Sequence, residues 1–171
     1  MIVGEPTEMQ LIGGNKGSRS FTAIVRGVPG HSSEPDRGAN AIIGASRLVA
    51  FLDDYQQELR ANADPDCPFD PPYTTFDIGL INGGTAANII PGECRVTWGF
   101  RMLPTDDSDA IEARVRAHAA EHIDPWMKKI APEAGVEIIR RNEVPPLIPD
   151  TDSPAEQIIR HLTGLNQSGV V

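Results

Sequence analysis

The strict alternation of side chains across residues 95–102 constrains this sequence more than any other feature. Apolar side chains occupy every second position of the segment, at Val96, Trp98, Phe100 and Met102. The positions between them carry arginine, threonine and glycine. A β-strand places successive side chains on opposite faces, so one face of this strand is covered and the other is solvated. An antiparallel sheet with a second layer on one side only has this pattern.

Three further segments are predicted to be strands of the same sheet. In residues 18–27, apolar and other side chains alternate from Phe21 to Val25, and the run ends at a Gly-Val-Pro-Gly turn. Residues 74–81 alternate in the same way, and residues 136–141 form a fourth, shorter segment. The sheet is therefore expected to have four strands.

Two long helices are predicted between these strands. Apolar residues recur at three- and four-residue steps across residues 41–59, which is the period of a helix with one buried face. A second stripe runs from Ile111 to Ile123 and follows Asp and Ser residues that suit a helix start. Pro125 is expected to kink or break this second helix, because proline has no amide N–H to donate.

The order strand, helix, strand, strand, helix, strand is that of the ferredoxin-like split βαβ unit. This α+β fold is a four-stranded antiparallel sheet with two helices on one face, and its second and fourth strands are the edges. We assign the unit to residues 16–143. The second strand, residues 74–81, is expected to be the longer edge and carries one charge, Asp77. Because it is poorly protected, we predict that it pairs, with the adjoining first helix, to its copy in a homodimer.

The two flanks of this unit have a different character. Residues 1–15 begin as the end of a buried strand, and residues 144–171 contain a third predicted helix over residues 154–162. Ser153 and Glu156 have the spacing of a capping box at its start. Both flanks are expected to be remnants of an α/β catalytic domain into which the unit is inserted, and both chain ends have the character of cuts.

Charge and hydropathy exclude two classes of partner. The chain has 15 Lys and Arg against 24 Asp and Glu, a formal net charge of −9, whereas nucleic-acid binding needs clustered basic residues. No apolar run approaches the roughly 20 residues that span a bilayer, and no signal peptide opens the chain. Cys67 and Cys94 lack a paired spacing, so reduced thiols and a cytoplasmic location are predicted.

Two polar motifs lie in predicted loops. His31, in Gly30-His31-Ser32-Ser33, is either an exposed surface histidine or a rigidly held donor to a developing oxyanion. Glu5 follows an apolar strand end and is either a solvated turn residue or an oxygen ligand that the backbone directs at a metal ion. The residue types alone leave both alternatives open.

Three other features lie near the sheet or on a helix. Asn88, in the glycine-rich residues 83–91, is either a turn residue or a polar contact to a ligand. Arg101, on the polar face of the third strand, is either a solvated charge or a bidentate clamp for a carboxylate. His118 and His122 match the H-x-x-E-H pattern of some zinc proteases, but charged neighbours and the lack of a suitably spaced third ligand favour a surface helix.

Taken in chain order, several short motifs resemble those of the acetylornithine deacetylase, succinyl-diaminopimelate desuccinylase and aminoacylase family of dinuclear zinc hydrolases. The matching motifs are Gly4-Glu5-Pro6-Thr7, Asn15-Lys16-Gly17, Gly30-His31-Ser32-Ser33, the Gly-Gly-Thr-x-x-Asn-Ile-Ile-Pro run that begins at Gly83, and Gly99-Phe100-Arg101. Each motif is short, but the ordered set extends over essentially the whole chain. The resemblance implies a dimerisation and lid domain within a two-domain enzyme.

The resemblance also implies roles for four residues. Glu5 matches a carboxylate ligand of one of two bridged zinc ions, for which cobalt is an alternative. His31 matches a lid histidine that stabilises the tetrahedral oxyanion, often in the site of the partner subunit. Asn88 and Arg101 match residues that contact the substrate backbone and its free carboxylate.

The implied activity is removal of the acyl group from an N-acyl amino acid, with N-acetyl-L-ornithine in arginine biosynthesis as the first expectation. Metal-bound hydroxide would attack the acyl carbonyl, with a Glu as general base. No predicted strand carries the family's His-x-Asp motif, and its Glu-Glu pair and C-terminal His ligand are absent from these 171 residues. A catalytic zinc needs at least three protein ligands, so this chain alone is expected to be inactive and to bind no stoichiometric zinc.

Two alternatives remain open. Within the family, the substrate class could instead be that of a succinyl-diaminopimelate desuccinylase, a dipeptidase or an aminoacylase. The alternative from another class is a stand-alone ferredoxin-like module for dimerisation or binding. Glu5 distinguishes the two classes, because a pure binding module has no use for a strand-end carboxylate outside its own fold.

Overall fold

The computed structural model describes residue 7 and residues 10–150, 152–165 and 167–171. The long elements are β2 (Gly17–Arg26), α1 (Ala41–Ala61), β4 (Thr75–Gly83), β6 (Glu93–Met102), α2 (Ser108–His118), β7 (Gly135–Val144) and α4 (Pro154–Thr163). The short elements are β1 (Ile12–Gly14), β3 (Gly30–His31), η1 (Pro35–Arg37), β5 (Ile89–Ile90), the π-helix η2 (Ala119–Ile123), α3 (Asp124–Lys128) and β8 (Gly169–Val170).

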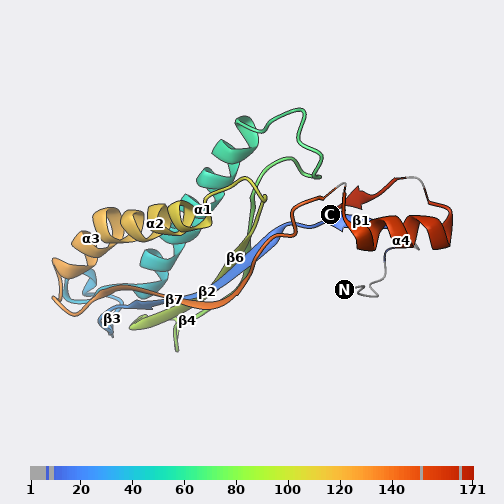
Figure 1. Cartoon of the computed structure of the whole chain (residues 1–171). Coiled ribbons are helices and arrows are strands. Elements are labelled where there is room, and N and C mark those ends of the chain that lie inside the picture. Colours follow the sequence, from blue (N-terminus) through green and yellow to red (C-terminus); the bar gives the residue numbers. More distant parts are fainter. Residues whose placement is uncertain (1–6, 8–9, 151, 166) are drawn as a thin grey trace.

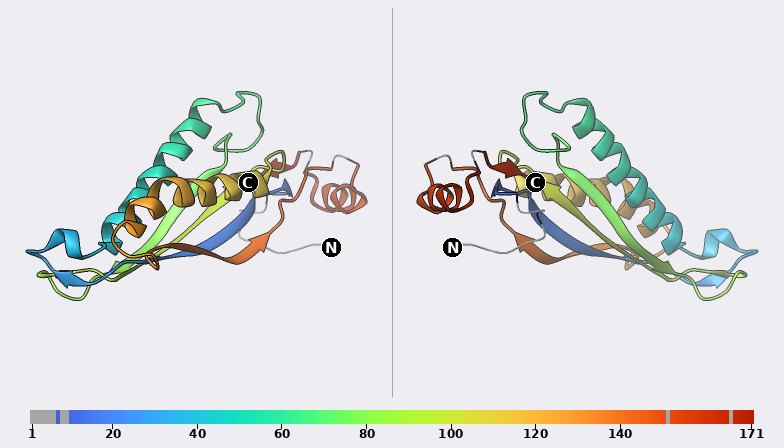
Figure 2. Two further views of the ribbon diagram at one scale, coloured as in Figure 1. Left: turned by 90° about the vertical axis from the view of Figure 1, so that its left-hand side faces the viewer. Right: turned by 90° about the vertical axis from the view of Figure 1, so that its right-hand side faces the viewer.

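The central layer is a four-stranded antiparallel sheet with the order β4-β6-β2-β7. Helices α1, α2 and α3 all lie on one face of this sheet (Figures 1 and 2). This arrangement is the ferredoxin-like fold that the order of the elements predicts, with β4 and β7 at the edges. No helix in the described part of the chain is long and apolar enough to cross a membrane.

Aromatic side chains fill the space between the sheet and the helices. Trp98 on β6 is 2% exposed, which confirms the covered face predicted from the alternation. Its ring stacks on Phe21 of β2, with ring centroids 4.3 Å apart, and Phe21 also stacks on Phe100 at 5.8 Å. Helix α1 packs on this layer through a stripe that includes Leu48 and Leu52, both fully buried. The core is continuous from the sheet to the helices.

Gly44 allows α1 to approach the sheet closely. A Cβ atom at this position would lie 2.9 Å from Val25 Cγ1 and 2.9 Å from the Met127 sulfur. Both distances are shorter than Cβ contacts normally are, so a larger residue would push the helix away from β2 and α3.

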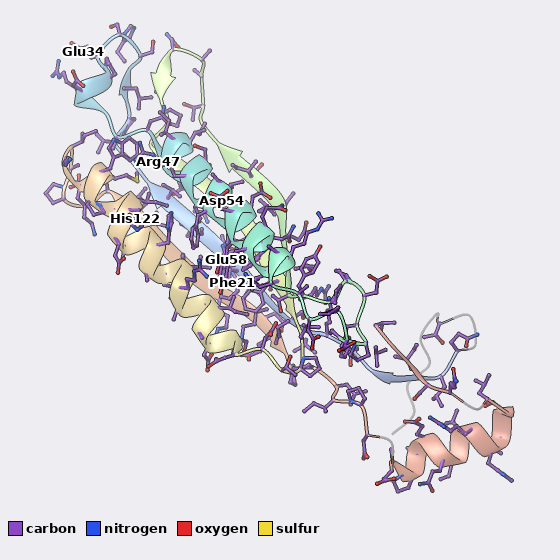
Figure 3. The ribbon with its side chains drawn as sticks, turned by 90° about the horizontal axis from the view of Figure 1, so that it is seen from above. Phe21, Glu34, Arg47, Asp54, Glu58 and His122 are labelled. Carbon is purple, nitrogen blue, oxygen red and sulfur yellow. The ribbon has the colours of Figure 1, made fainter. Side chains whose placement is uncertain are left out.

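A seam of stacked side chains joins α1 to α2, η2 and α3. The Arg47 guanidinium lies 4.0 Å from the Trp126 ring centroid, and the Phe51 ring stacks on His118 at 3.7 Å. Further along, Arg114 forms a bidentate ion pair with Glu58, in which each terminal guanidinium nitrogen donates to one carboxylate oxygen. Figure 3 shows Arg47 and Glu58 on α1, with His122 on the neighbouring helical segment. Arg47 and Phe51 are four residues apart and so lie on the same face of α1, which is the face toward the other helices.

The helix after α2 does not stop at Pro125, although the prediction of a local disturbance there is confirmed. The α-helical hydrogen-bond pattern changes to a π-helix in η2, and Pro125 then occupies the first turn of α3. A proline in this position needs no amide donor, and the wider turn before it removes the clash that proline makes with the preceding helical carbonyls.

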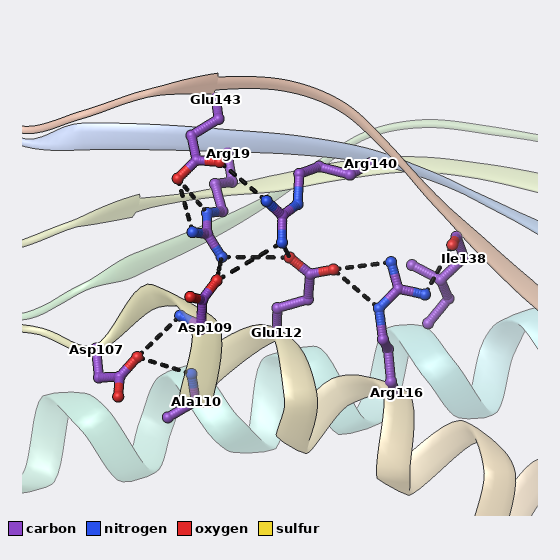
Figure 4. A network of polar contacts seen from close by, with 9 residues as sticks. All are labelled: Arg19, Asp107, Asp109, Ala110, Glu112, Arg116, Ile138, Arg140 and Glu143. Carbon is purple, nitrogen blue, oxygen red and sulfur yellow. Dashed lines mark hydrogen bonds and ion pairs between the residues drawn. The ribbon is translucent and has the colours of Figure 1, made fainter.

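An ion-pair network fastens α2 to β2 and β7 (Figure 4). Arg19, 5% exposed, donates to Asp109 at 2.7 Å, Glu143 at 2.6 Å and Glu112 at 3.3 Å. Arg140 reaches the same buried Glu112 carboxylate at 2.6 Å. Both arginines face carboxylates from another element, so the network joins α2 to β2 and β7. These contacts lie at the end of the sheet where β2 and β7 continue into the flanks.

The flanks form a small separate unit at one end of the sheet (Figure 1). Strands β1 and β8 pair in parallel, and α4 lies beside them. The third predicted helix is confirmed, but the predicted capping box is wrong. The Ser153 side chain makes no capping hydrogen bond, and Glu156 instead accepts from Arg160 at 3.0 Å and Ser168 at 2.7 Å. Glu156 is therefore bonded to the next turn of α4 and to the segment before β8 instead of to the start of the helix.

The fourth strand also differs from its prediction. Strand β7 has 10 residues rather than the short run expected over residues 136–141, so β4, with 9 residues, is not the longer edge. Alternation is weak along β7 because much of it is exposed and charged, including Arg140, Arg141 and Glu143. Strand β4 remains the less charged edge, and its Leu80 and Ile81 are 60% and 52% exposed.

Candidate functional site

His31 and Asn88 meet at a corner beyond one end of the sheet. Strands β3 and β5 pair antiparallel there, with His31 opposite Ile89. The Ser32 amide donates to the Asn88 carbonyl at 3.1 Å, which extends the pairing by one step. His31 on β3 and Asn88, in the turn just before β5, therefore come close together from motifs far apart in the sequence, and both are exposed.

Backbone hydrogen bonds hold this corner on the scaffold. The Gly27 amide donates to the Gly92 carbonyl at 2.8 Å, and the Ala41 amide donates to the Pro91 carbonyl at 2.9 Å. Asn40 caps the start of α1, because its side-chain oxygen accepts hydrogen bonds from the amides of Ile42 and Ile43. The corner is thus tied to β2, to β6 and to the first turn of α1.

Gly84 explains part of the glycine-rich motif in structural terms. Its φ of 81° lies in the left-handed region, where a side chain is strained. This turn carries the chain from β4 toward β5, so the glycine is required by the backbone whether or not a ligand approaches it.

The His31 ring has one defined partner. Its Nδ1 lies 2.7 Å from Ser33 Oγ and accepts from the Ser33 amide at 3.3 Å. A backbone N–H only donates, so Nδ1 is the unprotonated nitrogen and the proton of the neutral ring is assigned to Nε2. An Nε2–H on an exposed ring is a donor for an incoming oxygen. The sequence motif contains Ser33, but only the folded turn reveals this contact.

A hollow of about 680 Å³ lies next to this corner. Its walls come from the loop after β3, the first turn of α1, the loop before β5 and the end of the helical layer. Ile42, Ile43 and Ile89 line it and are partly exposed, at 38%, 43% and 41%. An apolar hollow with polar rim residues is suited to burying another chain or a ligand.

Arg101 lies at the opposite end of the sheet from His31. It is exposed on β6, between Ser18 of β2 and Thr75 of β4, on the face that the helices do not cover. Within the described residues it has no hydrogen-bond or ion-pair partner. Eight residue steps separate Glu93 from Arg101, which at about 3.4 Å per residue is about 27 Å. One small substrate does not span that distance, so a single chain does not bring these residues into one site.

The predicted metal ligand Glu5 lies outside the described residues. Within residue 7 and residues 10–150, 152–165 and 167–171, no group of three or more His, Cys, Asp and Glu side chains could hold a metal ion. His118 stacks flat on Phe51, and burial followed by the nearby His122 lowers the pKa of its imidazole. His118 thus takes part in helix packing, whereas Glu121 and His122 are exposed.

The two cysteines occupy unrelated places. Cys67 and Cys94 are both free, and Cys94 on β6 is buried in the core, where burial raises the pKa of its thiol. Such a thiol resists ionisation and is therefore unreactive.

Comparison with known sequences places residues 13–127 in one family, described as the peptidase dimerisation domain of the M20 group. Among curated relatives, the chain is 40% identical over 110 residues to an acetylornithine deacetylase of Myxococcus xanthus, covering 64% of this chain and 29% of the relative. It is 32% identical over 163 residues to an acetylornithine deacetylase of Proteus mirabilis, covering 95% and 41%.

A succinyl-diaminopimelate desuccinylase of Nitrosospira multiformis is 36% identical over 127 residues, covering 71% of this chain and 32% of the relative. The chain thus spans between 29% and 41% of the length of these relatives.

Solved structures share the fold at low sequence identity. An aminopeptidase PepT from Bacillus cereus matches 94% of this chain and 39% of its own, with a TM-score of 0.63 and 20% identity. A tripeptidase from Staphylococcus aureus matches 95% of this chain and 39% of its own, with a TM-score of 0.64 and 18% identity. From the sequence match over residues 13–127, which include three of the four strands of the ferredoxin-like sheet, the chain belongs to the M20 peptidase dimerisation domain family.

Proposed function

We propose that this chain is the dimerisation and lid portion of a metal-dependent amide hydrolase that removes the acyl group from an N-acyl amino acid. N-acetyl-L-ornithine is the proposed substrate and arginine biosynthesis the proposed pathway, because relatives that cover 64% and 95% of the chain are acetylornithine deacetylases. Succinyl-diaminopimelate is the second candidate, supported by the 36% identity to a desuccinylase.

The observation that carries the proposal is the paired corner of His31 and Asn88. A histidine whose Nδ1 accepts from Ser33 carries its proton on Nε2, and the exposed Asn88 lies in the neighbouring segment, where its backbone carbonyl accepts from Ser32. When an amide carbonyl becomes tetrahedral, its oxygen gains negative charge, and a preplaced N–H donor stabilises that charge. His31 would supply this donor, and Asn88 would orient the substrate.

His31 and Arg101 lie too far apart in one chain to contact the same substrate. Because about 27 Å of strand lies between the ends of β6, His31 and Arg101 would serve one substrate only if they come from different subunits. Arg101 would bind the substrate carboxylate in its own subunit's site, and His31 would reach into the partner's site. The homodimer would therefore be required for activity.

The edge strand β4 would form the dimer contact. Leu80 and Ile81 are more than half exposed there, and Ile42 and Ile43 continue the apolar surface onto α1. Edge-to-edge pairing of two copies would satisfy the free backbone groups of β4 and bury these side chains.

The flanking unit would belong to the catalytic domain. The match to the Proteus mirabilis enzyme extends over 163 residues, beyond the 13–127 of the dimerisation domain. Residues 1–15 and 144–171 would thus be parts of that domain, and the complete enzyme would hold two zinc ions, with Glu5 as one ligand. The described residues do not themselves build such a metal site. The proposed location is the cytoplasm.

The decisive experiment compares His31→Ala with His122→Ala in the complete enzyme that contains this chain. Loss of a charge-stabilising donor should lower kcat by about a hundredfold, whereas His122, an exposed helix residue, is the matched control. Metal content, measured by atomic emission, should stay unchanged in both variants. A normal kcat for His31→Ala, or loss of metal from it, would refute the oxyanion role.

Mixed dimers test whether the site is shared. His31→Ala and Arg101→Ala subunits are each expected to be inactive as homodimers. In a heterodimer, one of its two sites would receive an intact His31 and an intact Arg101, so mixing should restore about a quarter of the activity if exchange is random. No recovery after verified exchange would contradict the shared site. Comparison of N-acetylornithine with N-succinyl-diaminopimelate as substrates then separates the two candidate activities.

A further inference from the structure

We propose that Ser33 is a positioning residue for His31 and holds the imidazole with its proton on Nε2 and its ring plane fixed. This inference deepens the proposed function, on whose assignment of His31 its catalytic consequence rests. The contact itself is a property of the described loop and is testable without catalysis.

Two groups of Ser33 meet the same ring nitrogen. The amide N–H donates to Nδ1 at 3.3 Å, and Oγ lies 2.7 Å from it. Because the amide is a donor only, Nδ1 accepts, and the hydroxyl hydrogen also points toward Nδ1 in the neutral ring. Two donors on one nitrogen stabilise the Nε2–H tautomer over the alternative, in which Nδ1–H would face the amide N–H.

The turn supplies the right place for Ser33. The Glu34 amide donates to the His31 carbonyl at 3.0 Å, which closes a β-turn that begins at His31. The turn brings the third residue back beside the side chain of the first. Since Ser32 is bonded to the Asn88 carbonyl at 3.1 Å, the turn is anchored to the β3–β5 pair, and Ser33 has a fixed base from which to hold the ring.

The His31 ring has little else to restrain it. Its side chain is exposed and lacks the packing that fixes a buried imidazole. Among the described residues, Ser33 is its only hydrogen-bond partner. Without the hydroxyl the ring would rotate more freely and exchange tautomers, so Nε2–H would be presented to substrate for a smaller fraction of the time.

The primary test is nitrogen NMR of this 171-residue chain. Long-range correlations between ring protons and ¹⁵N nuclei of His31 separate the two tautomers. The unmodified chain should show a protonated Nε2 and an unprotonated Nδ1 at a pH where the ring is neutral. Ser33→Ala should shift both nitrogen signals toward averaged values, and Ser33→Thr should keep the original pattern because it retains the hydroxyl.

Ser46→Ala is the matched control. Ser46 is also exposed, and its hydroxyl also makes one local hydrogen bond, to the Ile43 carbonyl at 2.8 Å. This variant should leave the His31 signals unchanged. If Ser33→Ala leaves them as unchanged as Ser46→Ala does, the proposal is overturned.

The kinetic test uses the complete enzyme and distinguishes positioning from general structure. Ser33→Ala should lower kcat by about tenfold, as expected for loss of one hydrogen bond in the transition state, with KM nearly constant. Ser33→Thr should restore kcat. If the NMR pattern changes while kcat of Ser33→Ala stays normal and His31→Ala is impaired, Ser33 does not position the ring for catalysis. If His31→Ala is itself fully active, the proposed function fails, and NMR still decides whether Ser33 holds the ring.

Discussion

Replacing Trp98 by alanine should remove the centre of the core between sheet and helices. The side chain is 2% exposed, its ring stacks on Phe21 at 4.3 Å, and Phe76 lies at 6.2 Å. An aromatic side chain buries about 150–250 Å², which at about 25 cal/mol per Å² is worth about 4–6 kcal/mol. The stacked pair adds about 1 kcal/mol.

The indole nitrogen reduces that total. Trp98 Nε1 is buried and has no hydrogen-bond partner among the described residues, and an unsatisfied buried donor costs about 1–3 kcal/mol. Trp98→Ala should therefore lower the free energy of unfolding by about 3–5 kcal/mol. Trp98→Phe keeps a stacked ring and removes the unsatisfied donor, so it should cost less than about 1.5 kcal/mol.

Urea unfolding followed by far-ultraviolet circular dichroism measures both variants, with fluorescence of the remaining Trp126 as a second probe. Protomer concentration must be held constant, because dimerisation couples to stability. If Trp98→Ala changes the unfolding free energy by nearly zero, the core assignment is wrong. If Trp98→Phe costs as much as Trp98→Ala, the reasoning about the unsatisfied nitrogen is wrong.

Four other changes test separate features. Arg101→Lys in the complete enzyme should leave kcat/KM as low as Arg101→Ala does, because an ammonium lacks paired donors; near-normal kcat/KM would make Arg101 a solvated charge. Leu80→Lys should convert a micromolar dimer of this chain to a monomer in light scattering; an unchanged dimer would refute the β4 contact. Burial, then His122, lowers the pKa of His118 below 6.5, so stability should fall as pH drops through the folded-state pKa. His118→Gln should flatten that dependence of the urea midpoint. Arg19→Met should destabilise the chain by about 1–3 kcal/mol, since it removes the charged hydrogen bonds to Asp109 and Glu143 while Arg140 still pairs with Glu112; a neutral result would show that Arg19 adds no net stability.

The sheet was predictable where one face is covered along a whole strand. In β6, apolar side chains meet the helices and the positions between them are exposed or half-buried, so the period of two is visible in the sequence. In β2 the buried positions Phe21, Ala23 and Val25 show the same period, although Ile24 on the other face is buried too. Strand β7 was underestimated because its last residues pair with β2 while they stay exposed. The capping box failed because Glu156 finds Arg160 and Ser168 as partners, and sequence spacing carries no information about Ser168.

For the candidate site, the sequence predicted which residues belong to it but not how they are arranged. Strands β3 and β5 have two residues each, too few to show any period, and they form because backbone bonds from Gly27 and Ala41 hold both segments in place. The resemblance to known hydrolases singled out His31, Asn88 and Arg101, but the order of motifs does not say which of them share a corner. That information comes from the antiparallel register of the folded chain.

The sheet order also governs how this chain reaches its native state. Central strand β2 pairs with β6 on one side and with β7 on the other, so Phe21 has Trp98 and Arg140 as its cross-strand neighbours. Both neighbours lie far from Phe21 along the chain, and the entropic cost of closing such long loops slows folding. Strands β4 and β6 pair across a short connection and are available earlier. On the ribosome, β2 would thus wait with one edge unpaired until β7 is made, and chaperone binding should concentrate on that strand.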